Sequence, residues 1–517
     1  MTGGACALLI ATHAAVAQEP PVLARIVAEG FRHSEVDAHA RTLSDTIGAR
    51  ITASPADRQA RIWATERLRG WGLAVHEETF LFGRGWSIED AEARMISPRL
   101  LRLRSVPIAW TPPTAGPIVG EVVVAPLQTP ADLVTWHGKL AGRIVLVTAP
   151  EPPQDATGAP FTRWSDDDLR QADRFHPPVD ASAWLDTINR HQAFLVTRDA
   201  YLKQEGAIAW VRMASATNGS VGGEGYGFRV GHTPSLPGVE MAAEDYRRIM
   251  RLAATGPVRL AIRSDVRFHD DDPNGHNLLA DLPGRDTHAG MVMVGAHLDS
   301  WAAGDGAADD GAGVAVVMEA ARILAALHLP TKRTIRFALW DGEEQGLFGS
   351  SVYVAEHLAI RAPEPDPDRR LSGPFFSNRS IIGRRPGYGA LAAYFNLDNG
   401  SGRIRGVYAD GNLSAVPILS RWLAPLASMG AAHVLARGNS GSDHDPFAQA
   451  GLPAFPLVQD DLDYDSVVHH TNLDTYDHLR VDDLRQAAVV LAFLLVQAAD
   501  DDARLPIQRG GRLWPSR

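Results

Sequence analysis

One stretch of the chain, residues 291–313, constrains the fold more than any other: MVMVGAHLDSWAAGDGAADDGAG. It reads as a buried strand over 291–295, a loop of small residues, and an apolar helix that begins near 311. Small residues allow a backbone to fold closely around a compact object. Imidazole and carboxylate groups are ligands suited to zinc. The stretch therefore makes a metal site plausible, and its polar residues are His297, Asp299, Asp309 and Asp310.

Strands and helices alternate from residue 276 to residue 499. Strands are expected over 291–295, 334–340, 391–397 and 454–458, and helices over 311–327, 347–358, 415–429 and 482–499. Such alternation predicts an α/β fold with a mixed, mostly parallel sheet sandwiched by helices. In sheets of this kind, functional residues gather just beyond the carboxyl ends of the strands.

Three further places carry ligand-like residues, most of them after a predicted strand. Glu343 and Glu344 follow one strand, Asp398 follows another, and His469 and His470 stand later in the chain. Adjacent carboxylates after a buried strand are destabilising unless a cation or separate roles stabilise them. Two metals and one base would do this. One glutamate would bind metal, and the other would take a proton from metal-bound water, whose pKa a metal lowers to about 7, and pass it to the leaving amine.

The length of 517 residues predicts two or more domains, or one domain with a large insertion. The formal net charge of −11 argues against a nucleic-acid or anionic-membrane partner. No run after the amino terminus reaches the roughly 18 apolar residues that span a membrane.

The amino-terminal residues 1–17 have the pattern of a signal peptide cleaved after Ala17, with a disordered alanine-rich tail as the alternative. Cleavage would remove Cys6, the only cysteine, so any metal must be held by His, Asp and Glu. We therefore expect an exported protein, periplasmic or secreted, with no membrane insertion after cleavage.

The part of the chain before residue 276 divides into two segments of different character. Ser54 and the following proline predict the start of a helix that ends near Gly72. The stretch TPPTAGP at 111–117 indicates a boundary. Beyond it, 118–268 is rich in short β runs, with two helices at most and a solvated loop over 150–178. The expected division is a signal peptide over 1–17, a catalytic domain over 18–117 and 269–505, an insertion over 118–268 and a tail over 506–517.

The insertion resembles the protease-associated domain in the runs HGKLAGRIVLVT, YLKQEGAIAWV and PSLPGVEMAAEDYRRI. This resemblance implies a β-rich domain that covers or shapes an active site. An unrelated β-rich insertion is the alternative.

The motifs HLD, ADDGAG, DGEEQG, LDNG and HHTNLDT, in this order, resemble the two-zinc metallo-exopeptidase family of secreted aminopeptidases and plasma glutamate carboxypeptidase. The resemblance implies a hydrolase that cleaves dipeptides or the N-terminal residues of peptides through a metal-bound hydroxide. It also implies two Zn²⁺ per chain, with Co²⁺ or Mn²⁺ as alternatives, a peptide or dipeptide substrate, and leaves a homodimer open.

Residue by residue, the resemblance implies Glu343 as general acid/base and Asp299 as the residue that orients His297. Asp474 would support His470 in the same way, and the Asp309–Asp310 bond would be a cis peptide. His470 fits the family pattern better than His469, so His469 is assigned to substrate. The run SGSDHDPF at 440–447 resembles a family loop near the pocket, which implies that Ser442 or Asp443 touches substrate or braces the site; Ser442 is taken as the substrate residue. The implied metal ligands are His297 and Asp398 for one zinc, Glu344 and His470 for the other, and Asp309 as the bridge.

Two other functions stay open at this point. One is a glutaminyl cyclase, which shares the fold but uses a single zinc, and the other is a non-catalytic, receptor-like relative. The full set of five ligand positions disfavours the first, and the presence of Glu343 disfavours the second.

Overall fold

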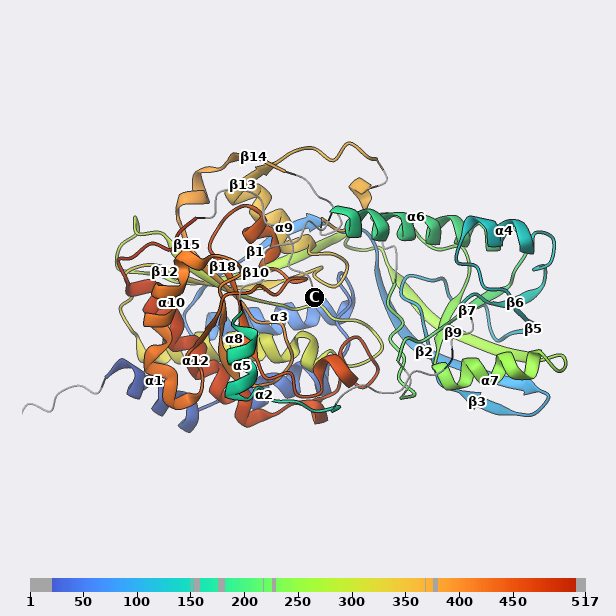
Figure 1. Cartoon of the computed structure of the whole chain (residues 1–517), viewed down its shortest axis with the longest axis horizontal. Coiled ribbons are helices and arrows are strands. Elements are labelled where there is room, and N and C mark those ends of the chain that lie inside the picture. The colour runs from blue at the N-terminus through green and yellow to red at the C-terminus, as the bar shows by residue number, and fades with distance from the viewer. Residues whose placement is uncertain are drawn as a thin grey trace, which may run out of the picture.

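A computed structural model of the chain describes residues 21–149, 152, 159–174, 182–216, 218–225, 229–367, 369–374 and 380–507. The predicted signal peptide with Cys6, and residues 508–517 of the predicted tail, lie outside this range. Among the described residues, none of the helices combines the length and the apolar character needed to cross a membrane. The described residues form two eight-stranded sheets (Figure 1) and a two-stranded sheet of β13 (Ala359–Arg361) and β14 (Ile381–Arg384).

The first sheet is mixed, and its central strands are parallel. Strands β12, β11, β15 and β18 lie side by side in this order and run in the same direction. This arrangement confirms the predicted mixed, mostly parallel sheet. The strand order is β1 (Ala74–Leu81), β10 (Asn274–Leu282), β12 (Thr334–Trp340), β11 (Met291–His297), β15 (Leu391–Asn396), β18 (Ala454–Gln459), β16 (Ile404–Tyr408) and β17 (His433–Leu435).

Helices cover the first sheet on both faces. On one face, α8 (Ala312–Leu327) and α12 (Val481–Asp500) pack against each other and against β11, and α1 (Val22–Arg32) packs on both helices. Nearly all of α8 is buried, which agrees with its apolar sequence. On the other face, α9 (Phe348–Tyr353) and α11 (Asp445–Gln449) enclose an aromatic cluster around Trp340, Tyr394 and Phe447.

Helix α3 (Pro55–Gly70) begins where the sequence predicts. The Ser54 side chain accepts a hydrogen bond from the backbone N–H of Asp57, and Pro55 occupies the first helical position. Two shorter elements precede it, α2 (Val36–Arg41) and a π-helical turn over Thr42–Ile47. The predicted helix over 415–429 is α10 (Val416–Leu423) followed by a 3₁₀ segment, Ala424–Met429.

The second sheet lies beside the first and contains strands from before the expected boundary at 118. Strand β2 pairs antiparallel with β9 along most of its length, so residues from Gly85 onward belong to this sheet. We therefore propose that the insertion begins near residue 85. The strand order is β3 (Leu101–Leu103), β2 (Gly85–Ser97), β9 (Arg259–His269), β5 (Ile118–Val124), β6 (Arg143–Leu146), β7 (Ala209–Met213), β8 (Gly238–Met241) and β4 (Ser105–Pro107).

The expectation of two helices at most between residues 118 and 268 is wrong. The described residues of this stretch form four: α4 (Pro130–Trp136), α5 (Asp166–Ala172), α6 (Ser182–Gln204) and α7 (Ala243–Ala253). Two of them are single short helices of seven residues, each started by a capping box, Thr129 with Asp132 and Ser165 with Asp168. Their length leaves too few turns for an apolar stripe to be legible in the sequence.

The expected loop over 150–178 is wrong for residues 166–172, which form α5, whereas its acids Asp166, Asp167 and Asp168 are exposed as expected. Residues 160–174 return to the first sheet. Thr162 forms a β-bridge with Leu462, and the Trp164 indole donates to the carbonyl of Gln459 at 2.8 Å. Helix α5 packs Leu169 and Ala172 on Leu435 of β17 and Val458 of β18. This segment, the returning segment 160–174, ties the insertion to the edge of the first sheet.

Candidate metal centre

The sheet register brings the predicted ligands together at one edge. His297 ends β11 and pairs in register with Trp340, the last residue of β12, so Glu343 and Glu344 follow immediately beside it. On the other side, the backbone N–H of Leu397 donates to the carbonyl of Gly295, which places Asp398 next to His297. The carboxyl ends of three adjacent parallel strands thus place three separate sequence motifs side by side at one edge of the sheet.

His297 and two carboxylates form the first group. Its Nε2 atom lies 3.3 Å from Asp309 Oδ1 and 3.5 Å from Asp398 Oδ1. Its Nδ1–H donates to the main-chain carbonyl of Asp299 at 3.0 Å, which leaves Nε2 free to face the carboxylates. Ligand atoms from all three side chains lie within 4.8 Å of one another. This spacing suits a single cation.

Asp309 also takes part in a second group. His470 Nε2 lies 3.3 Å from Asp309 Oδ2 and 3.0 Å from Glu344 Oε2. His469 approaches the same carboxylate oxygen at 3.8 Å, and its side chain is 40% exposed, whereas that of Glu344 is 2% exposed. We favour Glu344 as the third member because it is closer and is buried. Asp309 is shared by the two groups, as a bridging ligand would be.

The donor atoms of these groups fit a metal. His297 Nε2, Asp309 Oδ2 and Glu344 Oε1 are buried and have no hydrogen-bond partner among the described residues. A buried polar atom without a partner is destabilising, and a cation would remove that penalty. A cavity of about 10 Å³, the size of one water molecule or ion, lies against Asp309, Glu344 and His470. The donor set of nitrogen and oxygen atoms is one that zinc accepts.

The two adjacent glutamates are held by Asp299. Its carboxylate, fully buried, accepts the backbone N–H groups of Glu343 at 3.2 Å and Glu344 at 3.3 Å. The Thr52 hydroxyl lies 3.2 Å from Asp299 Oδ2 and 2.6 Å from Gln345 Oε1. Asp299 therefore orients His297 through its carbonyl and positions the glutamate loop through its carboxylate, a second role that the sequence does not suggest.

Burial and nearby acids raise the pKa of both glutamates. Burial and the charge of Asp309 raise the pKa of Glu344 to about 8. Burial raises the pKa of Glu343 well above its ordinary value; His297 opposes this, while Asp398 adds to it. The ionised forms of these carboxylates are therefore unfavourable unless a positive charge lies nearby. The raised pKa values and the donor atoms without partners both indicate a cation site.

The bond between Asp309 and Asp310 is a cis peptide, which confirms the expectation from the resemblance. Asp474 does not support His470 as expected. Its carboxylate instead accepts the backbone N–H groups of Ala308 at 2.6 Å and Asp309 at 3.2 Å, so it fixes the bridging residue. Burial and Asp309 raise the pKa of Asp474 to about 7.

Arg50 holds the loop that leads to Asp309. The side chain is completely buried, and its guanidinium donates to five backbone carbonyls. Gly306 has a φ of 60°, and a Cβ atom there would lie 2.4 Å from Ser300 Cβ and 2.9 Å from Arg50 Nη2. The loop therefore closes around an arginine from the amino-terminal part of the chain; the accepting carbonyls are those of Leu43 (3.3 Å), Gly48 (3.1 Å), Leu298 (2.7 Å), Asp305 (3.0 Å) and Gly306 (2.8 Å).

The two residues assigned to substrate differ in their surroundings. The His469 ring lies against that of His470, with centroids 3.9 Å apart and planes tilted by 33°, and is partly open to solvent. Ser442 is buried, and its hydroxyl accepts a hydrogen bond from the Asn396 amide at 2.8 Å. His469 is thus placed to meet a ligand, whereas the Ser442 side chain is occupied within the fold.

Sequence reasoning missed Glu224, which comes from the insertion. Its carboxylate lies 2.9 Å from His470 Nδ1, the ring nitrogen that faces away from Asp309 and Glu344. Histidines that bind metals donate their other N–H in this manner, which fixes the tautomer and raises ligand basicity. The pKa of His470 is raised well above its ordinary value because Glu344, Asp309 and Glu224 outweigh burial. Glu224 has no motif around it that would have indicated this role.

The chain is similar to known peptidases. Residues 277–495 match the family model of Peptidase family M28. Carboxypeptidase Q of Bos taurus is 26% identical over 472 residues, 90% of this chain and 85% of that protein. For carboxypeptidase Q of Homo sapiens the identity is 28%, over 53% of this chain and only 52% of that protein.

Two solved structures have the same fold. A peptidase M28 precursor from Shewanella amazonensis has a TM-score of 0.65 at 21% identity, covering 94% of this chain and 98% of that one. A zinc aminopeptidase from Bacillus subtilis has a TM-score of 0.59 at 20% identity, covering 91% and 96%. Residues 277–495 thus match peptidase family M28, and with the carboxypeptidase Q relatives this match supports a hydrolase of the metallo-exopeptidase type.

Proposed function

We propose that the protein is a two-zinc exopeptidase that releases N-terminal residues from peptides or cleaves dipeptides. The observation that carries this proposal is the pair of donor groups that share Asp309, with Glu343 next to them on the loop after β12. His297 and Asp398 would hold one ion, Glu344 and His470 the other, and Asp309 both. Cobalt or manganese are alternatives to zinc that this donor set also accepts.

The chain's own residues would divide the chemistry as follows. The bound metals would supply Lewis acidity, which lowers the pKa of a coordinated water and polarises a peptide carbonyl. Glu343 would take a proton from the attacking water and give it to the leaving amine. Its buried position raises its proton affinity, which suits the donating half of that cycle. Asp299 would keep Glu343 in place through the backbone N–H.

Removal of metal is the direct test of this proposal. A chelator is expected to reduce hydrolysis of aminoacyl-nitroanilides and dipeptides by about 10³-fold or more, since the developing charge loses its electrostatic stabilisation. Added zinc or cobalt should restore activity, and metal analysis should find about two ions per chain. Activity that resists the chelator, or stays absent after metal is restored, would overturn the proposal. One ion per chain would favour the single-zinc alternative, and bound metal without any hydrolysis would favour the receptor-like one.

Glu224 should contribute to metal affinity through His470. Replacing it by alanine is expected to weaken zinc binding by about 10- to 100-fold, because the His470 ring loses the acceptor that orients it. Glu224→Gln should fall between alanine and wild type, since an amide oxygen still accepts the Nδ1–H. Competition with a chromophoric chelator measures the affinity, and Glu66→Ala, on the exposed face of α3, is the control. Equal zinc affinity in wild type and Glu224→Ala would contradict the assignment.

Export after signal cleavage, assembly as a homodimer and substrate contact by His469 and Ser442 stay predictions. The amino-terminal mass of the protein isolated from cells tests the first, and sedimentation tests the second. The exposed ring of His469 favours its assignment to substrate. The Ser442 hydroxyl already accepts a hydrogen bond within the fold, so its assignment has less support.

A further inference from the structure

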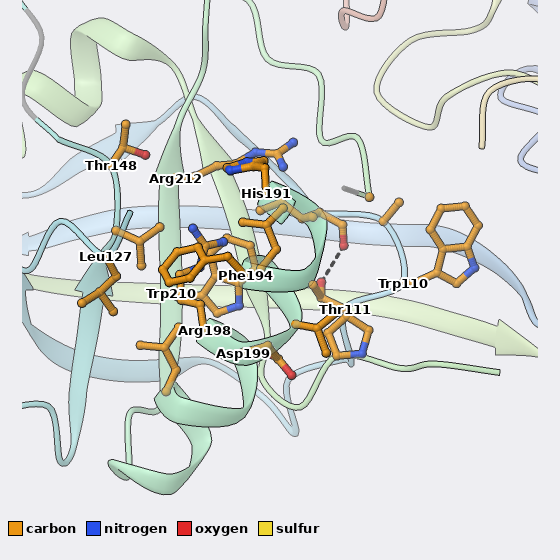
Figure 2. A pocket seen from close by; sticks show the side chains of 18 of the residues that line it. Trp110, Thr111, Leu127, Thr148, His191, Phe194, Arg198, Asp199, Trp210 and Arg212 are labelled. Atoms are coloured by element: carbon orange, nitrogen blue, oxygen red, sulfur yellow. Dashed lines mark hydrogen bonds between the residues drawn. The ribbon is translucent and has the colours of Figure 1, made fainter. Parts of the chain in front are cut away.

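A cavity of about 320 Å³ lies between the second sheet and helix α6. None of the candidate metal ligands lines it. Strands β5, β6 and β7 run parallel to one another, and the residues that follow β5 and β6 line the cavity together with β7. Helix α6 forms the opposite wall (Figure 2). The region beyond the carboxyl ends of parallel strands is where open α/β sheets bind ligands. The volume falls in the range of small-molecule sites.

The wall of this cavity combines apolar side chains with two guanidinium groups. Leu127, Phe194 and Trp210 supply apolar surface, and Arg198 and Arg212 supply positive charge. Figure 2 shows Arg198, Phe194 and Trp210 close together, between α6 and the strands. A site of this composition favours a ligand that has both an apolar body and an anionic group.

Most of the charged groups in this region are already engaged. Arg212 Nε donates to Glu240 at 2.7 Å, and its Nη2 donates to the carbonyl of Glu224 at 2.8 Å. The Asp199 carboxylate accepts the backbone N–H of Ser235, with oxygens at 2.9 and 3.0 Å. These contacts fix the walls and the loop opposite α6.

Arg198 differs from these groups. Within the described part of the chain, its guanidinium makes neither an ion pair nor a hydrogen bond, and it lies 5.0 Å from the centroid of the Trp210 ring. Burial, followed by the charge of Arg212, lowers the pKa of Arg198 to about 10. The Asp199 carboxylate on the same helix opposes this shift but does not pair with Arg198, so a half-buried guanidinium that lines the cavity keeps unused donors.

We propose that this cavity is a second binding site for a small carboxylate with an apolar or aromatic body. The carboxylate would bind Arg198, and the body would pack against Phe194, Trp210 and Leu127. A guanidinium presents paired N–H groups that match a carboxylate, and the same group stacks on the indole. A free apolar amino acid and the carboxyl-terminal residue of a peptide share this chemistry. The proposal stands apart from the metal centre and does not depend on the proposed function.

Calorimetric titration of the metal-loaded, full-length protein tests the site. N-acetyl-L-phenylalanine represents a peptide carboxyl terminus, L-phenylalanine a free amino acid, and N-acetyl-L-phenylalaninamide the same body without the charge. We expect the better of the two acids to bind with a Kd of about 0.1–1 mM. The neutral amide should bind at least about tenfold more weakly, because it offers Arg198 no anion. The tighter of the two acids identifies the source of the ligand.

Variants on α6 provide the matched comparison. Arg198→Met should weaken binding of the acid by about tenfold or more, and Arg198→Lys should fall between, because it keeps the charge but not the fork of donors. Arg190→Met removes an exposed arginine from the same helix and should bind like wild type. Peptide hydrolysis should be unchanged in all three variants, which verifies their fold.

Three results would overturn the proposal: no binding of either acid to wild type, equal affinity for the acid and the amide, or equal affinity in Arg198→Met and Arg190→Met. If Arg198→Met does not fold, the comparison of acid with amide on wild type and the Arg198→Lys titration decide the matter. Failure here leaves the proposed function intact, since the two sites share no residue.

Discussion

Replacing Glu343 by glutamine is expected to lower kcat by about 10²- to 10⁴-fold while the protein keeps its full complement of metal. Glutamine has the same shape and keeps the backbone N–H that Asp299 accepts, but its amide cannot take up and return a proton. The change therefore removes proton transfer and little else. KM should stay within a few-fold of wild type, because binding of the ground state does not depend on that proton.

The measurement combines steady-state kinetics with metal analysis of the same preparation. Glu66→Gln, an exposed change on α3, is the control for the substitution itself and should leave both quantities unchanged. Unchanged turnover in Glu343→Gln would refute the assigned role. Loss of metal together with turnover would instead make Glu343 a ligand, in place of its neighbour Glu344.

Replacing Arg50 by methionine should destabilise the protein by about 3–5 kcal/mol, the largest stability effect we expect from a single substitution outside the metal ligands. Methionine fills part of the same space but leaves five carbonyl groups, from Leu43 to Gly306, without their donor in the interior. The loop that carries Asp309 would lose its fixed shape. Metal affinity should therefore fall together with stability.

Calorimetric unfolding of the metal-loaded protein measures this effect. At about 2–4 °C per kcal/mol, the transition of Arg50→Met should lie about 10 °C lower than that of wild type. Arg69→Met, at an exposed position near the end of α3, should shift it by no more than about 2 °C. A transition temperature for Arg50→Met equal to that of wild type would mean that water or other donors satisfy these carbonyls.

The sequence predicts those residues of the metal centre that follow the ends of adjacent parallel strands. His297, Glu343 and Asp398 are far apart in the chain, yet each follows a strand of high apolar content, and parallel strands must place such ends side by side. Helix starts are likewise local, so the cap at Ser54 can be identified from a few residues. In these cases a short stretch contains all the information that the structure uses.

What the sequence does not reveal depends on contacts between distant segments. Strand β2 finds its partner in β9, more than 170 residues later, and no local pattern shows that residues from Gly85 onward join the second sheet. Arg50 looks like one more surface cation until its five acceptors are known. Glu224 stands in a glycine-rich stretch without helical or strand periodicity, so only the folded chain shows that it meets His470.

The contact between Glu224 and His470 couples two equilibria, the binding of metal by His470 and the docking of the insertion on the metal centre. If His470 binds metal more tightly when Glu224 is docked, then by reciprocity the docked arrangement of the insertion must be favoured to the same extent when metal is bound. The returning segment 160–174 supplies a second, metal-independent attachment. Loss of metal would therefore loosen the side of the insertion around Glu224 and leave the other side attached, so that the insertion would pivot rather than detach.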